Sequence, residues 1–387
     1  MLVERDVAIV LSGGGINGVL MELGFLKRLK LSSYWPRIGW VVGTSAGALA
    51  GSLAALDRLE ELEEFLLELQ ADETFRPNRL WRLPLLGLHE YALPDTIAER
   101  FGDLVTLAAQ LRDAEVELIV IATDATPAQD ELDVRDYELV YSSRNTEPAE
   151  VAQAILASAA ISALVLPLAV GDRVATDGAW VRNFPLTHAY AQPGVREIVA
   201  FRYVPRYPHL GMGGVARLRR RLDKFGRVPP VRAFLEELRQ AEARDAQGLP
   251  AHLPEMIMRL TRAAIVRNTV VEEQAADEID ESIEELRRLN EDVRGLIRRD
   301  VRSKRDRARL ERAVLERFET ARFPFRHYRA IPRITVRGSV EEVSLEPGFR
   351  DQRPWTVEAK RELIERGYAL ADAELRSADA DEIAATG

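Results

Sequence analysis

The most informative segment of the sequence reads Val7-Ala-Ile-Val-Leu11-Ser12-Gly13-Gly14-Gly15-Ile16-Asn17-Gly18, close to the start of a chain of 387 residues. Its first five residues are all apolar, which is typical of a strand buried on both faces of a parallel sheet. From Gly18 to Lys30 apolar residues recur at helical spacing. The glycines permit a sharp turn and leave backbone N–H groups unshielded beside the positive end of the helix dipole. The segment therefore predicts a strand, an anion-binding loop and a helix.

The same alternation of strand and helix continues outward from this segment. We expect further strands at 38–42, 116–123, 138–141, 164–170, 174–176, 197–201 and 334–336, and helices at 45–56, 59–69, 148–160 and 356–375. Strands that alternate with helices predict an α/β fold whose layers surround a mostly parallel central sheet.

A second loop, Gly43-Thr44-Ser45-Ala46-Gly47, also lies between a predicted strand and a predicted helix. G-x-S-x-G in that setting is typical of a nucleophile elbow, a strained turn that exposes a serine hydroxyl. The plainer reading is a glycine-lined turn in which Ser45 caps the following helix.

Several other chemistries are excluded or disfavoured by the composition. Gly13, Gly15 and Gly18 match the dinucleotide pattern G-x-G-x-x-G, but no acidic residue that could hold a ribose occurs from 31 to 42. The chain has no cysteine and five scattered histidines, which rules out thiol catalysis and argues against a metal cluster. No metal or organic cofactor is implied. The net charge of -9 argues against a nucleic-acid partner.

A serine hydroxyl needs a base to become a nucleophile. None of the histidines stands in a glycine-rich or strand-end context; they are His89, His188, His209, His252 and His327. Asp177, in Thr176-Asp177-Gly178-Ala179, follows a short strand and stands in a turn. Its plainer reading is an ordinary Asp-Gly turn.

Taken together, the glycine loop, the G-T-S-A-G loop and the D-G-A turn resemble the patatin-like phospholipase family in order and spacing. The resemblance covers Val7 to about Arg202 and, weakly, Ile331 to Leu375. It implies a three-layer α/β/α patatin-like fold with a helical insertion. It also implies a Ser45–Asp177 catalytic dyad and an oxyanion hole formed by Gly13, Gly14 and Gly15. Further glycines would support these motifs; they are Gly18, Gly43, Gly47 and Gly178.

The resemblance implies a serine hydrolase that cleaves carboxylic esters of (lyso)phospholipids or related acyl lipids through an acyl-enzyme. One departure concerns Asn17, where many family members carry a basic residue, so the preference for a phosphate headgroup is in doubt. Two alternatives stay open. One is a catalytically silent module that binds lipid or protein through the helical insertion. The other is an α/β-hydrolase-type esterase with a Ser-His-Asp triad.

The charges divide the chain into unequal parts. Residues 211–325 hold 25 of the 53 basic and 21 of the 62 acidic residues, so this stretch is positive while the remainder is strongly negative. We expect a catalytic core at 1–207, a charged helical insertion at 208–325, a strand and helix at 326–377 that complete the core, and a flexible tail at 378–387.

Three segments are candidates for contact with a membrane surface: the apolar stretch Leu80–Leu88 and the basic segments Arg217–Lys224 and Arg302–Arg309. The plainer reading of the basic segments is a solvated helix face, with the acidic run Glu272–Glu285 available to pair with it. The uncharged span Val151–Gly171 contains Pro167 and is rich in alanine, so we expect a buried helix and a strand. With no visible signal peptide or membrane span, the sequence predicts a cytoplasmic protein with peripheral membrane contact.

Overall fold

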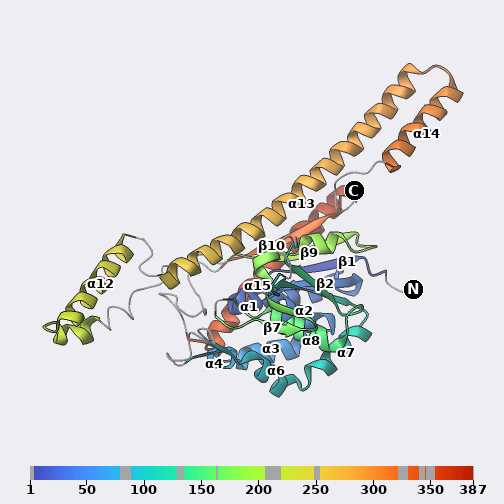
Figure 1. Ribbon diagram of the computed structural model, residues 1–387. Coiled ribbons are helices and arrows are strands. Elements are labelled where there is room, and N and C mark those ends of the chain that lie inside the picture. Colours follow the sequence, from blue (N-terminus) through green and yellow to red (C-terminus); the bar gives the residue numbers. More distant parts are fainter. Residues whose placement is uncertain are drawn as a thin grey trace.

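The computed structural model describes residues 4–78, 89–128, 135–162, 164–204, 219–247, 253–320, 330–339, 345 and 354–386 (Figure 1). Within them, an eight-stranded sheet has the order β10-β9-β1-β2-β5-β8-β7, and β6 pairs with β5 off this path. The strands are β1 (Val7–Leu11), β2 (Ile38–Thr44), β5 (Glu117–Asp124), β6 (Glu138–Ser142), β7 (Leu168–Val170), β8 (Arg173–Asp177), β9 (Glu197–Tyr203) and β10 (Arg333–Gly338). A separate pair joins β3 (Phe75–Pro77) to β4 (His89–Tyr91).

Most of the sheet is parallel, as predicted. The strands from β10 to β5 pair in parallel, whereas β6, β7 and β8 form antiparallel pairs at the other end. Parallel neighbours need crossover connections, which the helices supply. The helices are α1 (Gly15–Lys30), α2 (Ala46–Ala55), α3 (Leu59–Glu68), α4 (Ala71–Thr74), α6 (Leu93–Phe101), α7 (Leu104–Asp113), α8 (Pro148–Ser158), α9 (Ala179–Arg182), α10 (Leu186–Tyr190), α12 (Pro229–Ala246), α13 (Leu253–Asp300), α14 (Lys304–Thr320) and α15 (Val357–Thr386).

Burial on both faces explains the unbroken apolar run of β1. Val7, Ile9 and Leu11 belong to one apolar cluster, which also contains side chains of α1, α2, α3, α8 and α15. Ala8 and Val10 belong to the other cluster, together with side chains of α10 and α13. The sheet is thus the middle layer of three, and the predicted α/β/α fold class is confirmed.

The C-terminal strand and helix join this core. β10 pairs in parallel with β9, and α15 packs against α1. The two helices approach most closely where Gly24 of α1 faces Ile364 and where Gly367 of α15 faces Met21. A flexible tail is predicted at 378–387, and in the structure α15 continues to Thr386. The segment is rich in alanine, which has a high helix propensity.

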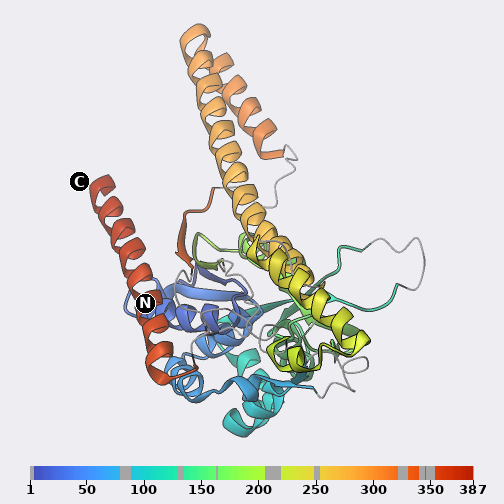
Figure 2. The same ribbon diagram turned by 90° about the vertical axis from the view of Figure 1, so that its left-hand side faces the viewer.

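In its described residues, the charged block between β9 and β10 is mostly helical. Figure 1 shows the α13–α14 hairpin extending beyond the sheet, while α12 lies on the opposite side of the core. Figure 2, turned by 90°, shows the same hairpin projecting from the layered core. The predicted boundaries at 207/208 and 325/326 fall outside the described residues.

The uncharged span forms a core element. In α8 the side chains of Val151, Ala154 and Ala157 are fully buried. The strand that follows is shorter than predicted, Leu168–Val170, because Pro167 has no N–H to donate to a ladder. In the described part of the chain, no helix has both the length and the apolarity that a bilayer crossing requires.

Candidate active site

Ser45 stands in a strained turn between β2 and α2. Its φ is 55° and its ψ is -122°, a backbone conformation that a residue with a Cβ rarely adopts. The turn is tight because a Cβ on Gly43 would lie 2.4 Å from the Gly47 carbonyl oxygen, and a Cβ on Gly47 would lie 2.6 Å from the Leu11 carbonyl oxygen. The G-x-S-x-G spacing therefore has a steric cause, and the turn has the geometry of a nucleophile elbow.

The sheet brings Asp177 to Ser45 across 132 residues of sequence. β8 runs antiparallel to β5, and its last residue, Asp177, is in register with Ala122 of β5. The neighbouring β5 residue, Ile121, is in register with Thr44, immediately before Ser45. As a result, Ser45 Oγ donates a hydrogen bond to Asp177 Oδ2 at 3.0 Å. The two residues that the sequence singled out are in direct contact.

The Asp177 carboxyl is buried, with 6% of the residue exposed. Burial raises its pKa to about 6, although hydrogen bonds from the Ala179 N–H and the Ser45 hydroxyl act in the opposite direction. The Ala179 N–H donates to Oδ1 at 2.9 Å, which leaves Oδ2 for Ser45. Gly178 must be glycine, because a Cβ there would lie 2.3 Å from the Ile121 carbonyl oxygen. Asp177 thus combines a fixed orientation with a basicity above that of an ordinary carboxylate.

The glycine loop lies beside this pair. A Cβ on Gly13 would be 3.1 Å from Ser45 Cβ, so the loop and the serine are adjacent. The Gly13 N–H donates to the Asn183 carbonyl oxygen at 3.0 Å. Within the described residues, the N–H groups of Gly14 and Gly15 donate to no other group of the chain. They stand at the N-terminus of α1, where the helix dipole favours negative charge.

Close packing also fixes the rest of this loop. A Cβ on Gly14 would lie 2.6 Å from Gly18 Cα and 2.8 Å from the Tyr203 ring, and Gly15 has a φ of 55°. The side chain of Asn17 contacts the C-terminal part of the chain. It is buried, and its Oδ1 accepts from the Leu345 N–H at 2.9 Å. Asn17, which stands where many family members carry a basic residue, therefore makes a structural contact with the C-terminal part of the chain.

Ser158 is a site residue that the sequence did not identify. Its Oγ accepts from the Ser45 N–H at 2.8 Å and donates to the Ile121 carbonyl oxygen at 2.6 Å. It therefore helps to hold Ser45 in its strained conformation. The only signal in the sequence was a serine within the alanine-rich helix 148–160, and nothing connected it to Ser45.

Asn183 and Thr269 were also missed. Asn183, just after α9, donates from Nδ2 to the Gly13 carbonyl oxygen at 3.4 Å and to Thr269 Oγ1 at 2.8 Å. Both residues are 1% exposed. Thr269 belongs to α13, so the helical block reaches the edge of the site.

Of the five histidines, the structure describes two, and neither hydrogen-bonds to Ser45. His188 Nε2 pairs with Glu138 Oε1 at 2.9 Å, and the His89 N–H donates to the Leu164 carbonyl oxygen. His209, His252 and His327 lie outside the described residues. Among the residues that the structure places, Asp177 is thus the base in contact with Ser45.

The first residues of the acidic run of α13 pair with the core. Glu272 contacts Arg182, and Glu273 contacts Arg202 and Arg337, the last at 2.9 Å. Further along α13, Glu284 and Glu285 pair with Arg287 and Arg288 of the same helix, as in the plainer reading of a solvated helix face. The apolar stretch Leu80–Leu88 lies outside the described residues.

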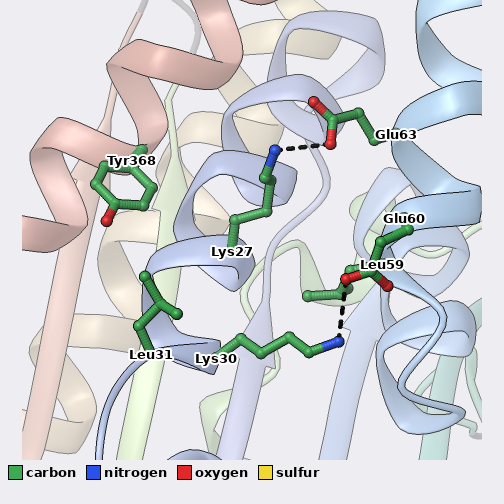
Figure 3. Close-up of a pocket in the computed structure, with 7 residues that line it drawn as sticks. All are labelled: Lys27, Lys30, Leu31, Leu59, Glu60, Glu63 and Tyr368. Atoms are coloured by element: carbon green, nitrogen blue, oxygen red, sulfur yellow. Dashed lines mark hydrogen bonds and ion pairs between the residues drawn. The ribbon is translucent and has the colours of Figure 1, made fainter.

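A cavity of about 270 Å³ lies at the other end of α1 (Figure 3). Lys27 and Lys30 line it and pair with Glu63 at 2.6 Å and with Glu60 at 3.3 Å. α1 has 16 residues, so its two ends are separated by about 24 Å. The cavity is thus remote from Ser45, and its charges are already matched. No group of three potential metal ligands occurs among the residues that the structure covers.

The chain is similar to known proteins in two comparisons, one with a solved structure and one with a family model. Among solved structures, the chain is similar to VipD from Legionella pneumophila, with 13% identity and a TM-score of 0.42 over 97% of this chain and 67% of that one. A search of curated proteins finds no match. Residues 9–190 match the family model described as patatin-like phospholipase, a span that includes the glycine loop, Ser45 and Asp177. Over these residues the chain is therefore similar to the patatin-like phospholipase family, a likeness that implies a lipid acyl hydrolase.

Proposed function

We propose that the chain hydrolyses carboxylic esters of (lyso)phospholipids or related acyl lipids through a Ser45–Asp177 dyad. The observation that carries the proposal is the 3.0 Å hydrogen bond from Ser45 Oγ to a buried Asp177, with Ser45 in a strained turn. In the first step Ser45 Oγ attacks the ester carbonyl carbon while Asp177 Oδ2 takes the hydroxyl proton. The raised pKa of Asp177 supports this role, because a stronger base is a better proton acceptor.

The negative charge that develops on the carbonyl oxygen needs hydrogen-bond donors. We assign this role to the N–H groups of Gly14 and Gly15, with Ala46 as a further donor at the N-terminus of α2. Gly13 belongs to the same predicted oxyanion hole, but its N–H is already bound to Asn183, so we assign it to the shape of the loop. Each oxyanion donor is worth about 3 kcal/mol of transition-state stabilisation.

The remaining steps use the same residues. The alcohol leaves with the proton held by Asp177, and an acyl group stays on Ser45 Oγ. Asp177, again a carboxylate, then takes a proton from the water that attacks the acyl carbon. The tetrahedral intermediate collapses, the fatty acid leaves, and Ser45 regains its proton from Asp177. No step needs a metal or an organic cofactor.

A fluorophosphonate probe tests whether Ser45 is an activated nucleophile. We expect one covalent adduct on Ser45 of the full-length protein, detected by mass spectrometry of the digested chain. Ser45→Ala should abolish that adduct, and Asp177→Asn should slow its formation at least about 100-fold, because the probe is attacked by the same hydroxyl. Absence of labelling at Ser45 would favour the alternative of a catalytically silent binding module.

Contact with an anionic membrane is a second part of the proposal. The basic segments Arg217–Lys224, which the structure describes from residue 219, and Arg302–Arg309 lie in the helical block, which we propose to be a separate unit inserted into the core. Some of their charges are paired locally, since Arg219 contacts Glu242 at 2.9 Å and Arg309 contacts Asp306 at 3.5 Å. The segment 302–309 still holds five basic residues against one acidic residue.

Vesicle binding measures this contact. We expect tighter binding to vesicles of phosphatidylcholine with phosphatidylglycerol than to phosphatidylcholine alone, because each basic residue near an anionic surface contributes about 1 kcal/mol. The triple variants Arg220→Gln/Arg221→Gln/Lys224→Gln and Arg302→Gln/Lys304→Gln/Arg305→Gln show which segment makes the contact. Equal binding of the unaltered protein to both vesicle types would contradict the idea.

A further inference from the structure

Asn183 forms hydrogen bonds with both backbone polar groups of Gly13, its N–H and its C=O. It follows Asp177 by six residues, and its backbone carbonyl oxygen accepts from the Gly13 N–H at 3.0 Å. Its side-chain Nδ2 donates to the Gly13 carbonyl oxygen at 3.4 Å. In a trans peptide unit, the C=O of Gly13 and the N–H of Gly14 point in opposite directions. Because Asn183 holds that C=O, the Gly14 N–H points away from Asn183. Among the described residues, this N–H has no hydrogen-bond acceptor.

Thr269 in turn fixes the side chain of Asn183. The second hydrogen of Asn183 Nδ2 is donated to Thr269 Oγ1 at 2.8 Å. The Thr269 hydroxyl donates its own hydrogen to the Ile265 carbonyl oxygen, one turn earlier in α13, also at 2.8 Å. Every donor in this chain of bonds has an acceptor. Because both side chains are almost completely buried, loss of the Thr269 hydroxyl would leave an N–H of Asn183 unsatisfied.

Neighbouring contacts hold α13 at this position. Asn268 Nδ2 donates to the Trp180 carbonyl oxygen at 3.3 Å. Glu272 Oε1 accepts from the Thr187 N–H at 3.0 Å, and Glu272 also pairs with Arg182. Asn268 directly precedes Thr269 on the helix, and Glu272 follows it by three residues. The segment that carries Asp177 and Asn183 is thus fastened to α13 on both sides of Thr269.

We propose that Thr269 is a positioning residue for the oxyanion loop: through Asn183 it sets the orientation of the Gly13–Gly14 peptide. The helical insertion then completes the catalytic centre in addition to any contact that it makes with membranes. The inference rests on the proposed function, since it assigns the Gly14 N–H to the developing oxyanion. It goes beyond that function by giving α13 a part in the chemical step.

Hydrolysis of p-nitrophenyl butyrate, a soluble ester, tests this role without a membrane. The hydrolysis rate of Ser45→Ala is the background and is subtracted from the rate of every other variant. We expect Thr269→Val to lower kcat about tenfold with little change in KM, because a misdirected donor weakens only transition-state binding. Thr269→Ser, which keeps the hydroxyl, should stay within about twofold of the unaltered enzyme. Thr261→Val, a matched change about two turns earlier on α13, should do the same.

A double-mutant cycle separates positioning from general packing. If Thr269 acts through Asn183, the variant Asn183→Ala/Thr269→Val has the same kcat as Asn183→Ala alone. If the kcat of the double variant is instead lowered by the product of the two single losses, the inference is wrong. Full activity of Thr269→Val, or an equal loss of kcat in Thr269→Val and Thr269→Ser, would also overturn it. Circular dichroism checks that each variant is folded, and Thr269→Ala replaces Thr269→Val in the cycle if the latter is unfolded. If the unaltered enzyme is no faster than Ser45→Ala, it is the proposed function that fails.

Discussion

Ser45→Ala and Asp177→Asn are each expected to lower kcat for ester hydrolysis at least about 10⁴-fold, because a nucleophile and its base act as one unit. Alanine removes the attacking oxygen. Asparagine has nearly the same shape as aspartate, and its single oxygen can still accept from the Ala179 N–H. Its NH2 group faces Ser45 as a donor only, so it cannot take the serine proton. The measurement is a steady-state assay on a lipid panel, with both variants compared against the unaltered protein.

The pH dependence follows from the raised pKa of Asp177, about 6. The base must be ionised, so kcat/KM should fall about tenfold per pH unit as the pH drops below about 6. A histidine base would titrate in a similar range, so this profile must be combined with conservative changes at each of the five histidines. If one of those changes abolishes turnover as fully as Ser45→Ala, the base is a histidine and the dyad is wrong.

A stability measurement shows that loss of activity in Asp177→Asn is not caused by unfolding. Because the pKa in the folded state lies above that in the unfolded chain, the native state binds more protons between about pH 4 and 6. The Asp177 contribution to the free energy of unfolding therefore becomes less favourable as the pH rises through this window. At neutral pH, Asp177→Asn should be more stable than the unaltered protein by up to about 3 kcal/mol, a gain that shrinks toward pH 4.

Gly24→Ala is expected to destabilise the fold by more than about 4 kcal/mol, which is exceptional for a single methyl group. The added Cβ would lie 1.9 Å from the Ile364 carbonyl oxygen and 2.6 Å from the Tyr368 nitrogen. Both are backbone atoms of α15, so the overlap is relieved only by separating two helices that pack tightly along the core. Urea denaturation, or the yield of soluble protein if none folds, measures the effect.

Gly295→Ala is the matched control. Gly295 is also within a helix, but a Cβ there would meet nothing within 4 Å. Alanine should therefore stabilise α13 locally by about 1 kcal/mol through its higher helix propensity. An unfolding midpoint for Gly24→Ala close to that of the unaltered protein would contradict the close crossing of α1 and α15.

Much of the layered architecture could be predicted because it depends on local periodicity. The runs Val7–Leu11 and Leu118–Ala122 are apolar without interruption, and each is buried from both sides in the sheet. Residues 93–101 and 104–113 form helices that the sequence did not predict. The second of these helices carries apolar residues at helical spacing, Leu104, Leu107, Ala108 and Leu111, so its periodicity was visible in the sequence.

The candidate site was predictable only where its residues belong to tight turns. Ser45 and Asp177 stand beside glycines whose spacing is visible in the sequence. Ser158, Asn183 and Thr269 act through contacts with residues 113, 170 and 86 positions away, and an isolated serine, asparagine or threonine carries no mark of such a contact. The partners of the acidic residues Glu272 and Glu273 could not be predicted either, because they depend on how α13 packs against the core.

The parallel pairing of β9 with β10 has a consequence for how this chain could change over time. The helical block leaves the core at the end of β9 and returns at the start of β10, its direct neighbour in the sheet. It therefore takes the place of one ordinary crossover, whose two ends are fixed whatever lies between them. Lengthening such a connection costs little, since loop-closure entropy grows only slowly with length. The far end of the hairpin is thus free to diverge, while the stretch around Thr269 is held by what it touches.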